Sequence, residues 1–304
     1  MLTVTKHRFA TMGTSAEVQV VDGDPTIVDQ AEHRLAALEA RWSRFRPGSE
    51  ISELNRRAGA SVPVAWETIL LLERAMAAAS ATEGRFDPTV GASLIAHGYD
   101  RTFAEVADHA RDLVPRPVID GSWPAIEVDR RTSTVCLPEG TIFDPGGIGK
   151  GLAADLVAEE LMRAGAHGVL VNVGGDLRVE GRAPGADGWV IDLEHPITGE
   201  SITHVRLAGG AIASTWRTKR TWGAPGDERH HLVDPATGAP AFAGLAGTAV
   251  LAARAWWAEV LAKAAFVDGP VEGRAVLERH HVTGYLVADD GAVQEVGAAA
   301  AFAA

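Results

Sequence analysis

A short glycine-rich run that carries one lysine has the residue types best suited to chemistry. It contains Gly146, Gly147, Gly149, Lys150 and Gly151, and an amphipathic helix is expected directly after it, over residues 152–164. Glycines let a backbone approach a ligand closely, and the unpaired amides at a helix start attract anions. The spacing is that of neither a Walker loop nor a dinucleotide fingerprint. The run therefore predicts either a phosphate cradle with Lys150 as its cation or a tight loop that caps a helix.

A second group places two imidazoles beside an Asp-Pro turn. His230 and His231 are followed by Asp234 and Pro235, and then by Ala-Thr-Gly. Histidine titrates near neutral pH, so this group could move protons or bind a metal. The spacing is not that of the helical histidine pair in zinc sites, and the alternative is a loop with exposed histidines.

Two further segments combine expected helix starts with side chains of the kind that bind ligands. Ser49 begins an expected helix that carries Ser52 and Asn55 one turn apart on a common face. Asp87 opens an Asp-Pro-Thr sequence ahead of another expected helix. Both segments suit either ribose and phosphate oxygens or ordinary helix caps.

Composition narrows the class of protein. The chain has 304 residues, of which 46% are apolar and 22% charged, and its formal net charge is −12. These values are typical of a globular protein of one or two domains, and the acidity argues against nucleic acid as a partner. The one cysteine, Cys136, cannot form an internal disulfide, and no apolar run reaches the ~18 residues of a membrane span. Because no apolar leader follows Met1, we expect a cytoplasmic protein.

The elements that must position these residues mix helices and strands without a regular βαβ rhythm. Apolar spacing predicts helices over residues 25–40, 68–79, 91–96, 152–164 and 255–267, besides the one that starts at Ser49. Shorter apolar runs predict strands over residues 9–21, within 115–137, on both sides of the Gly-Gly bend at 174–175, and over 189–193, 202–207, 282–287 and 293–296. The expected fold class is therefore α+β, with a frayed tail over residues 298–304.

The order of these segments resembles one family. Residues 11–14, 43–55, 86–91, 144–155, 171–181 and 231–238 follow one another as in the ApbE family, the FAD:protein FMN transferases. The most specific motifs are Gly-Gly-Ile-x-Lys-Gly, then Asn-x-Gly-Gly-Asp, then His-x-x-Asp-Pro-x-Thr-Gly. The resemblance covers about residues 8–290. It implies one ApbE-like domain over residues 1–304, with mixed or antiparallel sheets, flanking helices and a relation to the T-fold.

The resemblance also implies an activity. Members of the family cut the pyrophosphate of FAD, attach FMN to a serine or threonine hydroxyl of a target flavoprotein and release AMP. FAD and such a target are therefore the implied partners. By the same resemblance His231 is the general base, Asp234 orients it or its loop, and Lys150 acts on the diphosphate.

Cofactor-binding positions follow from the resemblance as well. Met12 and Thr14 would line the flavin entrance, and Asp176 would accept a hydrogen bond from ribose or adenine. The implied set is Met12, Thr14, Ser49, Asn55, Asp87, Gly146, Gly147, Gly149, Lys150, Asp176, Trp216 and His231.

The metal site is where this chain departs from the family pattern. Members hold Mg²⁺ with a backbone oxygen of the glycine run, here near Gly149, and with side chains of an Ala-Asp-x-x-x-Thr helix. Here the Asp position is Glu259 and the Thr position is Lys263. Because Mg²⁺ requires near-octahedral oxygen ligands, a lysine there is expected to weaken or abolish the site. Alternatively, Lys263 occupies the cation position and neutralises phosphate itself.

A second departure is Trp216, which stands where the family has glycine. Its ring could stack on the flavin, narrow the access of the target protein, or fill space against Trp222. The two departures leave three activities open: an FMN transferase, an FAD-binding carrier or sensor that has lost transfer, and an FAD pyrophosphatase.

Overall fold

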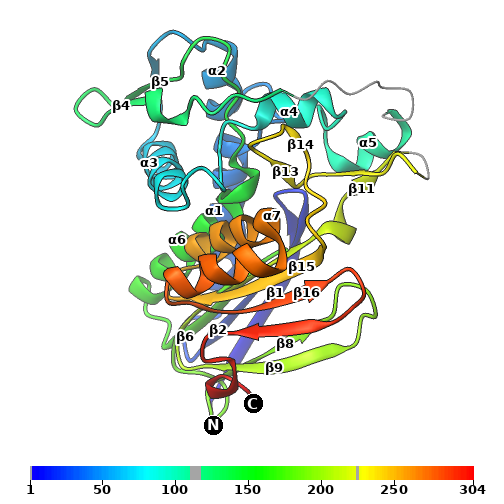
Figure 1. Ribbon diagram of the computed structural model, residues 1–304. Helices are drawn as coiled ribbons and strands as arrows, with labels where there is room; N and C mark the ends of the chain where they lie inside the picture. The colour runs from blue at the N-terminus through cyan, green and yellow to red at the C-terminus, as the bar shows by residue number, and fades with distance from the viewer. Residues whose placement is uncertain (1, 110–117, 224–225) are drawn as a thin grey trace. The chain divides into compact units, whose positions relative to one another are not determined.

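A computed structural model describes residues 2–109, 118–223 and 226–304 of the chain (Figure 1). It separates into two compact units, each built from non-contiguous segments. The first unit comprises Met1–Ala37, Ile148–Trp216 and Ala243–Ala304, and the second comprises Leu38–Gly147 and Arg217–Phe242. The single domain expected from the sequence stays a prediction.

The first unit contains most of the regular strands. Its elements are β1 (Val4–Thr11), β2 (Thr14–Val21), most of α1 (Ile27–Trp42), α6 (Gly149–Arg163), β6 (Gly168–Val173), β7 (Asp176–Gly181), β8 (Trp189–Glu194), β9 (Ser201–Leu207), β10 (Gly210–Trp216), β15 (Leu245–Ala252), α7 (Ala255–Arg279), β16 (Thr283–Ala288), β17 (Val293–Val296) and a 3₁₀ turn, Ala299–Ala301.

An eight-stranded sheet organises this unit. Its strand order is β1-β2-β6-β7-β10-β15-β16-β17, and every neighbouring pair is antiparallel. Helices α6 and α7 pack on one face of the sheet (Figure 1). The expected α+β class with antiparallel sheets and flanking helices is therefore confirmed.

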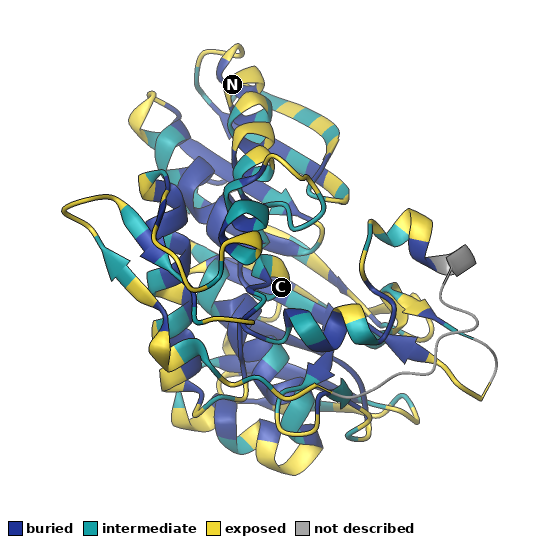
Figure 2. Cartoon of the chain, turned by 90° about the horizontal axis from the view of Figure 1, so that it is seen from above, coloured by how far each residue is buried: buried dark blue, intermediate teal, exposed yellow. Residues whose placement is uncertain are grey.

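Side-chain alternation along the strands gives the sheet two buried faces. In β7, Leu177 and Val179 belong to a core shared with Trp189 and Leu207 of the β8–β9 hairpin. The intervening Arg178 instead reaches Asp155 of α6 on the helix side. Successive side chains of a strand point to opposite faces, so alternate residues are buried in two separate layers. Figure 2 shows buried residues along the strands and helices, with exposed ones at turns and on the outer sides of some strands and helices.

Glycine-rich turns form one end of the sheet. Met12 and Gly13 join β1 to β2 with φ angles of 49° and 67°, the backbone of a tight hairpin turn. Gly174 and Gly175 join β6 to β7, also with positive φ, and a Cβ on Gly174 would lie 2.7 Å from Thr14 Oγ1. Close contact between the two turns therefore requires glycine at position 174.

The second unit is richer in loops and short helices. Its elements are the end of α1, α2 (Glu50–Arg56), β3 (Val62–Pro63), α3 (Trp66–Ala81), α4 (Gly91–Ala96), α5 (Phe103–His109), β4 (Glu127–Asp129), β5 (Thr134–Cys136), β11 (Thr221–Trp222), β12 (Arg229–His230), β13 (Val233–Asp234), β14 (Ala239–Pro240) and 3₁₀ turns at Trp123–Ala125, Pro145–Gly147 and Arg217–Lys219.

An aromatic cluster helps to hold the second unit together. Tyr99 and Trp222 pack with ring centroids 5.5 Å apart, beside the buried Leu94, Val106 and Val233. The indole N–H of Trp222 donates to the His97 carbonyl at 2.9 Å, so its one polar atom is satisfied inside the core.

Three sequence expectations about elements are corrected. Residues 9–21 are not one strand, because the Met12–Gly13 turn divides β1 from β2. The helix expected over 255–267 continues to Arg279, with a break at Gly269, where φ is 76°. The C-terminal tail does not fray: Ala299 is buried, and the amides of Arg206 and Ala304 pair residues 302–304 with β9.

Part of the strand region expected within 115–137 lies outside the described residues, namely 115–117. Within the described ranges, none of the helices combines the length and apolar character needed to cross a bilayer.

Candidate functional site

The starts of α6 and α7 lie against each other in the first unit, and two residues of α6 set their contact. The carboxylate of Asp155 accepts hydrogen bonds from the amides of Ala255 and Trp256, at 3.1 and 3.0 Å, and so caps α7. A Cβ on Gly151 would lie 2.5 Å from the Ala255 carbonyl oxygen. Glycine at 151 therefore permits the close approach, which places the second turn of α7 beside the first turn of α6.

This packing assembles a four-residue charged cluster, Lys150, Asp176, Glu259 and Lys263. Lys150 Nζ donates to Asp176 Oδ2 and, at 2.9 Å, to Glu259 Oε1. Lys263 Nζ donates to the same Glu259 oxygen at 3.1 Å. The other oxygen, Glu259 Oε2, accepts from the Gly151 amide at 2.8 Å. The two oxygens of this one carboxylate together bind three donors, two from α6 and one from α7.

The cluster is layered, with acids beneath cations. The side chains of Glu259 and Asp176 are 0% and 1% exposed, whereas those of Lys150 and Lys263 are 20% and 16% exposed. Carboxylates so deeply buried require partners. The two ammonium groups supply these partners and remain the part of the cluster that a ligand would meet.

The protonation states follow from these contacts. Burial acts to raise the pKa of Glu259, but Lys150, Lys263 and the Gly151 amide outweigh it and hold that pKa below its usual value. Burial acts to lower the pKa of Lys150, but Asp176 and Glu259 hold it above its usual value. Burial and the charge of Glu259 raise the pKa of Asp176 to about 6. At neutral pH the cluster therefore holds a positive charge on Lys150 and negative charges on Glu259 and Asp176.

The turns at the end of the sheet bring Thr14 and Asp176 into the same region. Asp176 is the first residue of β7 and directly follows the glycine turn that contacts Thr14. Met12 stands at the tip of the preceding hairpin. The first unit thus joins four of the residues predicted from the sequence directly, namely Lys150, Asp176, Glu259 and Lys263. Thr14 contacts the glycine turn that precedes Asp176.

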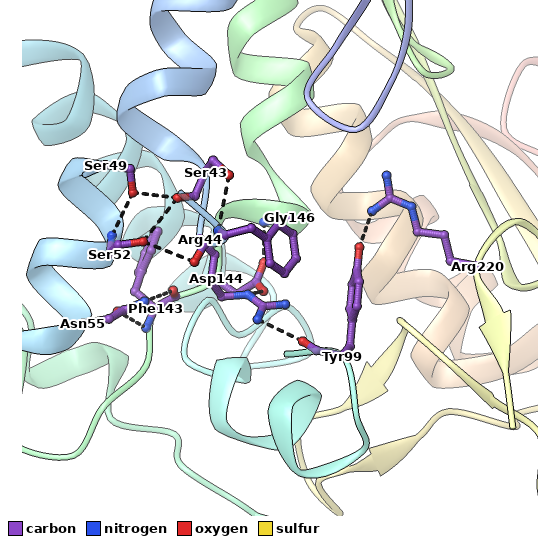
Figure 3. A network of polar contacts seen from close by, with 11 residues as sticks. Ser43, Arg44, Ser49, Ser52, Asn55, Tyr99, Phe143, Asp144, Gly146 and Arg220 are labelled. Atoms are coloured by element: carbon purple, nitrogen blue, oxygen red, sulfur yellow. Dashed lines mark hydrogen bonds and ion pairs between the residues drawn. The ribbon is translucent and has the colours of Figure 1, made fainter. Parts of the chain in front are cut away.

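In the second unit, Ser49 and Asn55 hold the backbone (Figure 3). The Ser49 hydroxyl caps α2 by accepting from the Ser52 amide at 3.0 Å, and it donates to the Ser43 carbonyl at 2.6 Å. Asn55 Nδ2 donates to the Phe143 carbonyl at 3.0 Å, and its Oδ1 accepts from the Phe143 amide at 2.8 Å. These contacts give both side chains a structural role, and their contact with FAD stays a prediction.

Asn55 thereby fixes the segment that leads into the glycine run, where sequence reasoning missed an ion pair. Arg44 Nε donates to Asp144 Oδ2 at 2.6 Å, and Asp144 Oδ1 accepts from the Gly146 amide at 2.6 Å. Arg44 also donates to the Tyr99 carbonyl at 2.9 Å, and the Tyr99 hydroxyl accepts from Arg220 at 2.9 Å (Figure 3). Arg44 and Asp144 both stand inside motifs noted from the sequence, but nothing in their spacing reveals the pair.

Asp87 also has a structural role in the second unit. Its Oδ1 accepts from the amide and the hydroxyl of Thr89, at 2.7 and 2.5 Å, which forms a turn ahead of α4. Burial raises the pKa of this carboxyl group. Of the expected glycines, Gly146 and Gly147 belong to the 3₁₀ turn Pro145–Gly147, while Gly149 is the first residue of α6.

The histidine loop of the second unit distinguishes its two imidazoles. His230 is buried, packs edge-on against Phe242 at 4.8 Å, and accepts from the Leu232 amide at 3.2 Å. Burial and the charge of Arg217 lower the pKa of His230 to about 4, so it is neutral at physiological pH. His231 is half-buried, in the connection between β12 and β13. The partly exposed His231 is therefore the better candidate for a proton-transfer group.

Asp234 stabilises the loop that carries His231. Its Oδ1 accepts from the Ala236 amide at 2.9 Å, and its Oδ2 accepts from the Thr237 hydroxyl at 3.0 Å. The Gly238 amide then donates to the Asp234 carbonyl at 2.8 Å. Of the two roles that the sequence left open, orienting the loop is the one these contacts support.

Trp216 fills space in the first unit. It is buried in the core beneath the β8–β9 hairpin, opposite Gly247 in the β10–β15 pair. A Cβ on Gly247 would lie 2.0 Å from the Trp216 ring, so the ring covers this glycine. Trp222 belongs instead to the aromatic cluster of the second unit. These contacts favour the space-filling role, and a contact of Trp216 with flavin stays a prediction.

With the geometry described, comparison with known proteins identifies the family. The sequence profile of the ApbE family matches residues 12–286. The chain belongs to the ApbE family. The FAD:protein FMN transferase of Haemophilus influenzae is 28% identical over 292 residues, which cover 91% of this chain and 84% of that protein.

Solved structures of ApbE proteins have the same fold. The ApbE protein of Thermotoga maritima superposes with a TM-score of 0.88 at 26% identity, covering 99% of this chain and all of that one. The flavinyl transferase ApbE of Pseudomonas stutzeri gives a TM-score of 0.81 at 25% identity, covering 97% of this chain and 95% of that one.

The residues present do not fit the magnesium ion that membership of the ApbE family implies. Among the described residues, no three His, Cys, Asp or Glu side chains gather in a way that could hold a metal. An ion about 2.1 Å from Glu259 Oε1 would lie about 4 Å from each ammonium group that this oxygen binds. At an effective dielectric constant of about 20, the repulsion from each is roughly 8 kcal/mol. The two lysines also already occupy Glu259 Oε1 and neutralise the carboxylates that would otherwise attract a cation. A divalent cation would have to displace them, so the cluster as built does not fit a metal at Glu259.

Proposed function

We propose that this protein transfers FMN from FAD to a serine or threonine hydroxyl of a target flavoprotein and releases AMP. The observation that carries this proposal is the layered cluster at the start of α6, where Lys150 and Lys263 stand above buried carboxylates. Partly exposed ammonium groups beside a glycine-rich helix start suit the diphosphate of FAD. The family and the names of its relatives supply the reaction class.

In this reaction the acceptor hydroxyl oxygen attacks the phosphorus atom of the FMN half of FAD. A new phosphoester bond forms, the bond from that phosphorus to the bridging oxygen breaks, and the bridging oxygen leaves with AMP. The hydroxyl proton passes to a general base, for which we propose His231. Lys150 stabilises negative charge on the diphosphate as the bond to AMP breaks.

Other proposed ligand contacts come from the family resemblance and the placement of the residues. Thr14, beside the glycine turn, and Met12, on the preceding hairpin, would contact the flavin. By the resemblance Asp176 would accept a hydrogen bond from ribose or adenine, but its burial beneath Lys150 does not support that contact and favours a role in holding Lys150. The contribution of Gly146 and Gly147 is a backbone path that allows close approach of phosphate. Residence in the cytoplasm stays a prediction of the sequence.

A second candidate is an FAD-binding protein without transfer activity, and a third is an FAD pyrophosphatase. Lys263 favours the second candidate, because it replaces a ligand of the family metal. The three separate in one assay, in which purified protein is incubated with FAD and a flavoprotein acceptor that carries a target serine or threonine. Transfer gives AMP together with covalent flavin on the acceptor, hydrolysis gives AMP and free FMN, and a binder gives neither. Absence of covalent flavin with every acceptor tried would refute the proposal.

A further inference from the structure

Lys263 stands where the family pattern has a threonine whose oxygen is a metal ligand. It lies one helical turn after Glu259 on α7, and its ammonium group is 3.1 Å from the carboxylate oxygen that also binds Lys150. The carboxylate of Glu259, which would otherwise be a metal ligand, therefore binds the ammonium groups of two lysines.

The anchored lysines retain hydrogen-bonding capacity for a ligand. Each ammonium group has three N–H donors. Within the described ranges, Lys150 uses two of them, on Asp176 and Glu259, and Lys263 uses one, on Glu259. Three donors in total remain, on side chains that are partly exposed above buried acids. A ligand arriving from solvent therefore meets N–H donors and positive charge before it meets a carboxylate.

We propose that the ammonium group of Lys263 replaces the divalent cation of this site, so that Lys150 and Lys263 together bind the diphosphate of FAD without metal. This inference rests on the proposed function for the identity of the ligand. Its physical basis is the shared Glu259 oxygen, which fixes both ammonium groups about 3 Å from one atom and so presents them as a pair. Fixed, paired donors suit a diphosphate, whose two phosphoryl groups offer neighbouring acceptor oxygens.

The first arm of the test titrates magnesium chloride, and then manganese chloride, into chelator-treated full-length protein in a calorimeter without FAD. The wild type is expected to bind neither ion when each is added at concentrations typical of cellular magnesium. The variant Lys263→Thr, which restores an oxygen ligand and removes one of the two repelling ammonium groups, is expected to gain binding. Stoichiometric binding of either ion by the wild type would overturn the inference. This arm does not depend on FAD, so it tests the absence of metal even if the protein does not bind FAD.

The second arm measures FAD affinity from the change in flavin fluorescence, with chelator or with magnesium. Wild-type affinity should agree within about twofold between the two conditions. Lys263→Met should lose about 10- to 100-fold, the effect of one charge-assisted contact, and magnesium should not restore it. Lys263→Arg should retain most of the affinity, whereas Lys6→Met, which removes an exposed lysine of β1, should change nothing.

Two results of the second arm would contradict the inference. One is a tenfold or larger gain in wild-type affinity when magnesium is added. The other is unchanged affinity in Lys263→Met, with the fold of the variant verified by circular dichroism. Metal-free FAD binding in a protein that never transfers FMN would refute the proposed function and leave this inference standing, so the two failures are distinguishable.

Discussion

The substitution Glu259→Gln tests the charged cluster most severely, because it changes charge while keeping shape. Glu259 is fully buried and accepts three hydrogen bonds, two of them from ammonium groups. A glutamine keeps one acceptor oxygen and turns the other into an amide donor that faces either a lysine or the Gly151 amide. Breaking a buried ion pair by removing one partner costs about 3–5 kcal/mol. We therefore expect the free energy of unfolding to fall by about that amount.

The measurement is urea unfolding at neutral pH in the presence of chelator, followed by tryptophan fluorescence. Glu272→Gln is the matched control, since Glu272 lies on the same helix but is exposed. The control should change the free energy of unfolding by less than about 0.5 kcal/mol. A second test combines Glu259→Gln with Lys263→Met. The double variant should lose less stability than the sum of the single variants, because each single variant already breaks the shared contact.

A loss below about 1 kcal/mol in Glu259→Gln, or a loss no larger than that of Glu272→Gln, would refute this reasoning. Strictly additive effects in the double variant would do the same. Either result would mean that the lysines do not depend on Glu259 for their placement.

Three further predictions address other parts of the structure. Gly247→Ala should lower the free energy of unfolding by more than about 2 kcal/mol, because its Cβ would overlap the Trp216 ring, while Gly185→Ala, with open space around it, should be nearly neutral in the same urea assay. The depressed pKa of His230 means that the unfolded chain takes up a proton near its ordinary value of 6.5, well before the folded chain does near 4. Stability should therefore fall by about 2 kcal/mol between about pH 7.5 and pH 5, and His230→Gln should flatten this part of the pH profile; an equal slope in the variant would count against the assignment. His231→Ala should spare FAD affinity but slow FMN transfer by about 10²- to 10⁴-fold, with His204→Ala as the control, and an unchanged rate would remove the residue from the role of base.

Periodicity and glycine placement predicted many of the elements that position the cluster. The helix after the glycine run, the strands around the glycine bend and the start of α7 all lie where apolar spacing placed them. The hairpin at Met12 was missed because methionine is not a turn residue, and its positive φ is a property of the assembled turn. The continuation of α7 was missed because a Gly-Pro pair normally ends a helix, and here the helix restarts after the break at Gly269.

Side-chain partners were less predictable than elements. The sequence places Lys263 four residues after Glu259 on one expected helix, and residues at that spacing share a helix face. It did not suggest that Lys150 would bind the Glu259 carboxylate, because that contact depends on how α6 packs against α7 through Gly151 and Asp155. The pair formed by Arg44 and Asp144 is 100 residues apart in sequence and is equally a product of tertiary structure.

The most direct test of this account is a time course of covalent FMN incorporation into an acceptor flavoprotein, read by intact mass, with chelator-treated enzyme and with added magnesium. The account predicts covalent flavin and equimolar AMP at the same rate in both reactions. Transfer that occurs only with magnesium would contradict the role given to Lys263, and AMP without covalent flavin would contradict the transferase itself.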